Sequence, residues 1–114
     1  MQVSLRTYDE SDVVIVDVVG EVDAHTVEPL RQTLADLVET NQVTVVTDLT
    51  GVTFMDSSGL GVLVNSLKQM RRRGGLLQLV VNDERLLKTF RITSLASVFT
   101  IHPTIDAAIA AIVR

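Results

Sequence analysis

The sequence contains no cysteine and no tryptophan, and its aromatic residues are three phenylalanines and one tyrosine among 114 residues. The absence of cysteine excludes disulfide bonds, thiolate nucleophiles and zinc sites with cysteine ligands. Because aromatic side chains are so few, the core has to be built from Val, Leu, Ile and Ala. Such a core is typical of an α/β fold with aliphatic parallel strands.

Long hydrophobic runs are also missing. No apolar run approaches the roughly 18 residues that a membrane-spanning helix needs. The first residues also lack the basic segment followed by an apolar stretch that is typical of a signal peptide. We therefore expect a cytoplasmic protein with no membrane partner. A chain of 114 residues is long enough for one core, so a single domain over residues 1–114 is expected.

Basic charge is scarce as well. The formal net charge is -4, which argues against direct binding of nucleic acid, because that needs a basic face to neutralise phosphates. The basic run Arg71 to Arg73 precedes Gly74 and Gly75. Cations complement the carboxyl end of a helix and glycine supplies its left-handed cap, so we interpret this run as a helix end.

The hydrophobic pattern predicts one mixed sheet covered by helices. Residues 3–8 and 13–19 flank an acidic turn, which indicates an antiparallel hairpin whose second strand lies inside the sheet. Helical spacing then alternates with short β-branched runs, which predicts an α/β fold with a mostly parallel sheet packed against about four helices. The elements expected after the hairpin are a loop at 20–23, a helix over about 26–40, a strand at 43–49, a helix over about 57–73, a strand at 76–81, a helix capped by Asn82 or Asp83, a strand at 98–101, and a last helix opened by Pro103 and Thr104.

Enzyme motifs are incomplete in this chain. The run Gly59-Leu60-Gly61 has the first two glycines of a dinucleotide fingerprint, but Val64 stands where the third would be. A nucleophile elbow around Ser57 would need a glycine where Met55 stands. No phosphate-binding P-loop sequence is present. We therefore expect no catalytic residues and no enzyme activity.

Metal and acid/base sites are not required by the sequence either. We interpret His25 as an exposed or capping residue at a helix start, and His102 as a solvated turn residue before Pro103. The aspartates that could supply a carboxylate pair or a Mg²⁺ site are Asp17, Asp23, Asp48 and Asp56. We expect Asp17 to point outward from a strand, Asp48 to end a strand and Asp56 to be a helix N-cap. These structural roles explain the three residues without a metal. We expect no metal and no cofactor.

The turn Asp56-Ser57-Ser58-Gly59 remains as the candidate site. With Asp56 as the N-cap, the serines occupy the first helical turn, where an added anion is stabilised by roughly 0.3 to 1 kcal/mol. A phosphate on Ser57 would add about -1.5 to -2 charges beside Asp56 and Asp23. The helix would tolerate this charge, whereas a partner docked on the turn would not. On spacing alone, this switch and a plain helix cap are equally good interpretations.

These residues, together with Gly20-Glu21-Val22-Asp23 and the segment 90–99, resemble the anti-sigma factor antagonist family, whose domain is called STAS. The resemblance covers nearly the whole chain, and the run Met-Asp-Ser-Ser-Gly-Leu-Gly is specific where it follows a strand and opens a helix. It implies the STAS fold and a bacterial regulatory protein. One departure is Ser94, which stands where the family often carries a glycine in an Ile-Thr-Gly-Leu turn.

The resemblance also implies a partner-switching cycle. Unphosphorylated, such a protein binds an anti-sigma factor and so frees a sigma factor for transcription. The anti-sigma factor is a serine kinase that phosphorylates the first serine after the aspartate, here Ser57. The phosphorylated protein dissociates from the anti-sigma factor, and a phosphoserine phosphatase restores binding by removing the phosphate. The residues expected to bind the partner are Asp23, Asp56, Ser57, Ser58, Gly59 and Leu60.

Two other functions stay open at this point. STAS domains also serve as scaffold or sensor subunits of stress-signalling assemblies, which would make the chain one part of a larger particle. A small enzyme or nucleotide binder that uses the run Gly59-Leu60-Gly61 is the third possibility.

Overall fold

The computed structural model describes residues 1–8, 11–42 and 44–112, which form a five-stranded sheet of order β1-β2-β3-β4-β5 and four α-helices. Strand β1 pairs antiparallel with β2, and the other neighbouring strands pair in parallel. The predicted α/β fold with an amino-terminal hairpin is therefore confirmed. The elements are β1 (Gln2–Thr7), β2 (Val14–Val22), α1 (Glu28–Glu39), β3 (Thr44–Met55), α2 (Ser57–Arg72), β4 (Leu76–Val80), α3 (Glu84–Ile92), β5 (Ile101–His102) and α4 (Ile105–Ile112).

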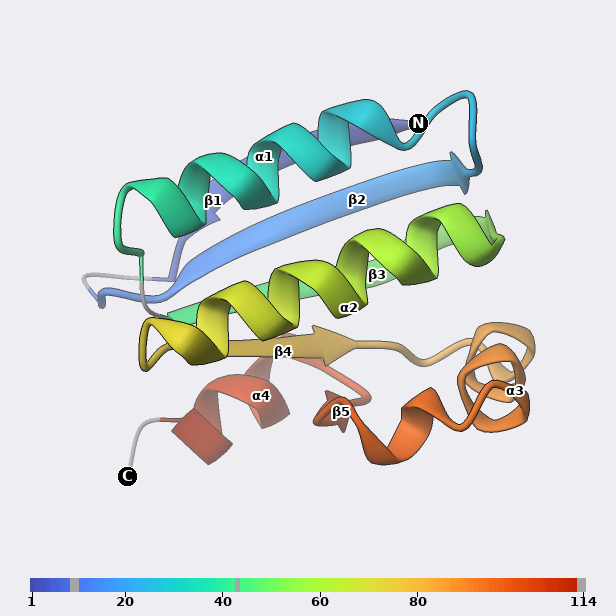
Figure 1. Cartoon of the computed structure of the whole chain (residues 1–114). Helices are drawn as coiled ribbons and strands as arrows, with labels where there is room; N and C mark the ends of the chain where they lie inside the picture. Colours follow the sequence, from blue (N-terminus) through green and yellow to red (C-terminus); the bar gives the residue numbers. More distant parts are fainter. Residues whose placement is uncertain (9–10, 43, 113–114) are drawn as a thin grey trace.

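Helices α1 and α2 lie side by side across one face of the sheet (Figure 1). The main core lies beneath them, because alternate strand residues point to that face and pack against apolar residues of α1, α2 and α3. Their sequence neighbours point to the opposite face and form a smaller core with Ala108 and Ile109 of α4. The last helix, predicted to follow Pro103 and Thr104, thus packs on the face of the sheet opposite α1 and α2.

Strands β2 and β3 are both longer than the sequence predicted. The loop expected at 20–23 is wrong for its first three residues, because β2 continues to Val22. Gly20 has φ +102°, and a register shift follows it in the pairing with β3, so a bulge lets the strand run on. Strand β3 likewise continues to Met55 instead of ending at residue 49.

The helix boundaries agree with the predicted signals. Asp56 and Asp83 are the N-caps of α2 and α3, and Gly74 has φ +74° just after α2. Arg71 and Arg72 lie in the last turn of α2, as expected for a helix end. These ends fix where α2 begins relative to the sheet, which is what positions the candidate site.

Four local predictions need correction or a limit. The strand expected at 98–101 is wrong in position: a 3₁₀ turn spans residues 95–97, and the strand is formed by Ile101 and His102. His102 is therefore half-buried rather than a solvated turn residue, and its Nε2 lies 2.9 Å from Gln78 Oε1. Asp48 lies inside β3 and not at its end, although its Oδ1 accepts a hydrogen bond from the Thr50 amide. The first residue of the strand expected at 43–49 lies outside the described residues.

Candidate functional site

The carboxyl ends of β2 and β3 lie side by side, and this brings the predicted site residues together. Val22 and Met55 are partners in the parallel register. The Asp56 amide donates a hydrogen bond to the Val22 carbonyl oxygen at 3.1 Å. Asp23 and Asp56, which follow these strands, therefore start two loops at the same edge of the sheet.

Asp56 caps helix α2 as the sequence predicted. Its Oδ1 accepts a hydrogen bond of 2.9 Å from the Ser58 amide, and its carbonyl oxygen accepts from the Leu60 amide at 3.2 Å. The amides of Ser57 and Gly59 belong to the first helical turn and have no acceptor within the helix. These free amides and the positive end of the helix dipole lie at the start of α2, so an anion bound at this helix start is stabilised.

The two serines differ in exposure. Ser57 is exposed and Ser58 is half-buried. Among the residues that the structure describes, neither hydroxyl makes a hydrogen bond to a histidine, lysine or carboxylate that would act as a general base. The turn thus offers a free hydroxyl beside backbone amides and lacks the nucleophile–base pair of a hydrolase.

Gly59 and Leu60 lie beneath the surface. A Cβ atom on Gly59 would stand 2.7 Å from Met55 Cγ and 2.8 Å from Val22 Cγ1, so only glycine lets α2 approach the two strand ends this closely. Leu60 is 7% exposed and belongs to the main core. Gly61, in contrast, is exposed and has open space where its Cβ would be. Gly59 and Leu60 therefore support the turn from below, and the outer surface is formed by other residues.

Asp23 organises its own loop. Its Oδ1 accepts hydrogen bonds from the amides of His25 at 2.9 Å and Thr26 at 3.0 Å, and its amide donates to Thr26 Oγ1 at 2.9 Å. The hydrogen bond from His25 is the main reason why the pKa of Asp23 lies below its ordinary value, with smaller contributions from Thr26. Asp23 is thus a fixed negative charge next to the serine turn, while His25 is exposed as expected.

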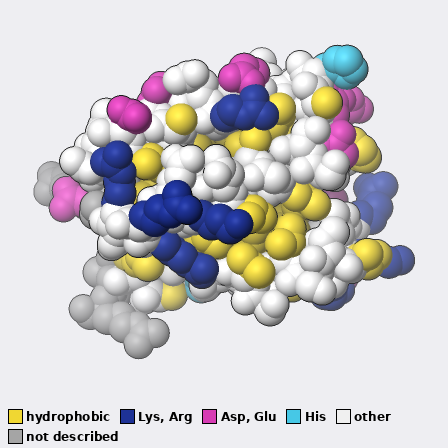
Figure 2. All heavy atoms as spheres, viewed as in Figure 1, with side chains coloured by type: hydrophobic (Ala, Val, Ile, Leu, Met, Phe, Trp, Pro, Cys, Tyr) yellow, Lys and Arg dark blue, Asp and Glu magenta, His cyan; other side chains and the backbone are white. Residues whose placement is uncertain are grey.

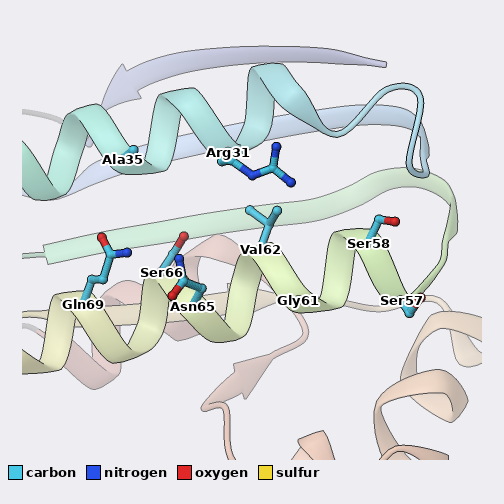
Figure 3. A pocket seen from close by; sticks show the side chains of 9 residues that line it. All are labelled: Arg31, Ala35, Ser57, Ser58, Gly61, Val62, Asn65, Ser66 and Gln69. Carbon is cyan, nitrogen blue, oxygen red and sulfur yellow. The ribbon is translucent and has the colours of Figure 1, made fainter.

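A groove between α1 and α2 begins at the serine turn (Figure 3). It encloses about 330 Å³, with Ser57 and Ser58 at one end. Arg31 reaches into it from α1. The sequence analysis missed Arg31, because nothing in the local pattern says which α1 residue meets the start of α2.

A second feature that the sequence analysis missed is Phe54. This large apolar side chain, two residues before Asp56, is 53% exposed. It lines a cavity of about 180 Å³ between the end of β3 and α3, together with Leu86. Thr53 and Phe54 are both exposed between buried Val52 and Met55, so the strand end does not alternate strictly and no local signal would have found Phe54.

The four aspartates do not gather at one place. Asp17 and Asp48 are register partners on β2 and β3, and Arg6 Nε donates to Asp17 Oδ2 at 2.7 Å. This hydrogen bond is the main reason why the pKa of Arg6 is raised. Within the described ranges 1–8, 11–42 and 44–112, no group of three or more His, Asp or Glu residues could hold a metal ion. None of the described helices is both long and apolar enough to span a membrane.

Comparisons with known proteins agree with this geometry. The chain matches the model of the STAS domain over residues 4–108. It is 33% identical over 102 residues to an anti-sigma-B factor antagonist of Listeria monocytogenes, with 89% of this chain and 90% of that protein covered. It is 33% identical over 101 residues to an anti-sigma-B factor antagonist of Bacillus subtilis, with 89% of this chain and 92% of that protein covered. The crystal structure of an anti-sigma factor antagonist from Mycobacterium paratuberculosis is similar with a TM-score of 0.87 and 27% identity, covering 96% of this chain and 92% of that one.

Proposed function

The chain belongs to the STAS domain family, and we propose that it acts as an anti-sigma factor antagonist that is switched by phosphorylation of Ser57. In its unphosphorylated form it binds an anti-sigma factor that is also a serine kinase, and a sigma factor is released. Phosphorylation of Ser57 ends this binding, and a phosphoserine phosphatase reverses the modification. The protein itself is a binding module rather than an enzyme, and it works where transcription takes place, in the bacterial cytoplasm.

The observation that carries this proposal is the exposed Ser57 hydroxyl in the first turn of a capped helix. A kinase needs an accessible hydroxyl, and the fold has to tolerate the product. Ser57 meets both requirements, because the neighbouring amides and the helix dipole stabilise an anion there. Phosphorylation is therefore expected to alter the surface without unfolding the domain.

The surroundings of Ser57 explain how a phosphate would disturb a partner. Asp56 and Asp23 already carry negative charge at this edge of the sheet, and a phosphate would add about -1.5 to -2 more. A partner surface that fits the unmodified turn would then face both steric and electrostatic conflict. This supports binding by the unphosphorylated form and release after modification.

The test is phosphorylation by the anti-sigma factor kinase of the same bacterium, with ATP, followed by mass spectrometry. We expect one phosphate on the wild-type protein and on Ser58→Ala, and none on Ser57→Ala. Ser58 is the matched control because it is the adjacent serine of the same turn. Unchanged labelling of Ser57→Ala, or no labelling of the wild type, would contradict the proposal.

A further inference from the structure

The groove between α1 and α2 continues along both helices. A second cavity of about 250 Å³ lies beyond the first and shares Ala35 and Gln69 with it. The combined α1/α2 groove, as we call it, runs from the serine turn to Arg72 and Arg73 at the end of α2. One end is therefore the proposed phosphorylation site, and the other is the basic end of the helix.

Positive charge lines this groove at both ends. Arg31 stands near the serines, and Arg72 and Arg73 stand at the far end, whereas the acidic lining residue among the described ones is Glu39. Lys68 and Arg71 are exposed on the same helix, and Figure 2 shows Lys and Arg side chains gathered over this face. The chain as a whole carries a formal net charge of -4. The basic face is thus a local exception in an acidic molecule.

These arginines keep donors for an outside partner. Arg31 is paired with Glu28 in an exposed ion pair, and Arg73 Nη1 donates to Asn41 Oδ1 at 2.8 Å. Within the part of the chain that the structure describes, Arg72 has no ion pair. A guanidinium has five N–H donors, so single partners leave several free for carboxylates.

We propose that the α1/α2 groove holds an acidic segment of the anti-sigma factor, with one end of the segment at Ser57. This inference rests on the proposed function and adds the chemistry of the partner. Carboxylates of the segment pair with Arg31 and Arg72. Asn65 and Gln69 line the groove between these arginines and offer amide donors and acceptors to its backbone.

A protein segment fits this groove better than a nucleic acid does. Nucleic-acid binding draws most of its free energy from phosphate neutralisation and needs a broadly basic surface, which a net charge of -4 opposes. The lining also includes apolar Ala35, Val38 and Val62, of which the two valines are buried. Such a lining suits the side chains of a peptide.

An acidic segment would also explain the direction of the switch. A phosphate on Ser57 would bring negative charge to the end of the groove that Arg31 also lines. It would repel the carboxylates of the segment and compete with them for the arginine. Since charges at an exposed surface interact over about 8 Å at physiological salt, this repulsion acts on the nearest part of the segment.

The experiment compares the affinity of the anti-sigma factor for the wild-type protein, for the groove variant Arg31→Ala with Arg72→Ala, and for a control, Lys88→Ala with Arg91→Ala. The control removes the same charge from α3, outside the groove. Binding is measured by calorimetry at about 50 mM and about 300 mM NaCl. Thermal unfolding verifies that each variant is folded.

We expect the groove variant to bind about tenfold more weakly at low salt, with the difference shrinking at high salt, and the control to bind within about twofold of the wild type. Equal affinities of the groove variant and the control would overturn the inference. If the wild type still binds the anti-sigma factor and is labelled on Ser57, that result leaves the proposed function intact. Displacement of the anti-sigma factor by a DNA duplex at matched concentration would assign the groove to nucleic acid and also overturn it. A wild-type protein that neither binds the anti-sigma factor nor is labelled would overturn the proposed function, and the inference with it.

Discussion

The amide of Asp56 donates a hydrogen bond of 3.1 Å to the carbonyl oxygen of Val22, and this contact joins the last residue of β2 to the N-cap of α2. The loop that starts at Asp23 and the turn that carries Ser57 are thereby held at one edge of the sheet. Because the loop and the turn follow neighbouring parallel strands, changes in the packing beneath the turn are expected to shift both Asp23 and Ser57.

Gly59 offers the most direct test of the packing beneath the turn. In Gly59→Ala, the new methyl group would meet Val22 Cγ1 at 2.8 Å and Met55 Cγ at 2.7 Å. We expect the free energy of unfolding to fall by about 1 to 3 kcal/mol, as in other overpacked cores. Urea denaturation measures this change.

Gly61→Ala is the matched control, two residues further along the same helix. Nothing lies within 4 Å of the place that its Cβ would occupy, so the alanine relieves the entropic disadvantage of a helical glycine. We expect a gain of about 0.5 to 1 kcal/mol. If both alanines shift stability in the same direction by similar amounts, the close approach of α2 to the strand ends does not explain Gly59.

Asp56 is expected to contribute to stability as a cap in addition to any role in binding. Asp56→Ala removes the acceptor of the Ser58 amide, which should lower the free energy of unfolding by about 1 kcal/mol. Asp56→Asn keeps an acceptor oxygen and should stay close to the wild type. Chemical denaturation of the three proteins checks the order, and an Asn variant as unstable as the Ala variant would speak against a hydrogen-bonding cap.

Ser94 is held in a left-handed conformation with φ +62°. The family that this chain resembles often carries a glycine at this position. A residue with a Cβ, such as Ser94, costs about 1 to 2 kcal/mol in the left-handed conformation. After allowance for the greater entropy of an unfolded glycine, Ser94→Gly should stabilise the protein by about 0.5 to 1 kcal/mol.

Thr93→Gly, at the preceding residue with φ -85°, is the control for this prediction. It should destabilise the protein, because the backbone is already in an ordinary region and the Thr93 hydroxyl bond to the Thr89 carbonyl oxygen at 2.8 Å is lost. Midpoints of thermal unfolding compare the two variants. A destabilised Ser94→Gly would contradict the account of this turn.

Asp23 is expected to make stability depend on pH. The pKa of Asp23 is lower in the folded protein than its ordinary value of about 3.9, chiefly because the His25 amide donates a hydrogen bond to it. The ionised carboxylate therefore stabilises the fold at pH values above about 3.9. This stabilisation is lost as the pH falls through the lower pKa of the folded state. Asp23→Asn keeps an acceptor but does not titrate. Between about pH 5 and about pH 3, the wild type should therefore lose more stability in urea denaturation than the variant does. Parallel losses would show that Asp23 does not contribute.

The sequence predicted most of the fold because the relevant signals are local. Helical spacing, the Asp56 cap, the Asp83 cap and the glycine after Arg73 are each read from a few neighbouring residues, and the structure agrees with them. The ends of β2 and β3 were missed because glycine in a strand is a weak local signal. The bulge at Gly20 and the pairing of Val22 with Met55 extend the two strands through contacts between them, which a local pattern does not report.

The candidate site was predictable only in part for the same reason. The turn Asp56-Ser57-Ser58 is a local pattern, so its place at the start of a helix followed from the sequence. Arg31 and the buried packing of Gly59 depend on how α1, α2 and the strands meet, which no local pattern reports. Ser57 as the phosphoacceptor and Asp23 as a partner contact stay predictions.

The most direct test of the central claim is the affinity of the cognate anti-sigma factor for the wild-type protein, Ser57→Ala and Ser57→Glu, measured by calorimetry under one set of conditions. Ser57 is exposed, so both substitutions should leave the fold intact. We predict that the wild type and Ser57→Ala bind with affinities within a few-fold of each other, because an exposed substitution that adds no charge has a small effect. Ser57→Glu should bind at least about tenfold more weakly, because it brings negative charge to the turn. Equal binding of all three proteins would contradict a switch at Ser57.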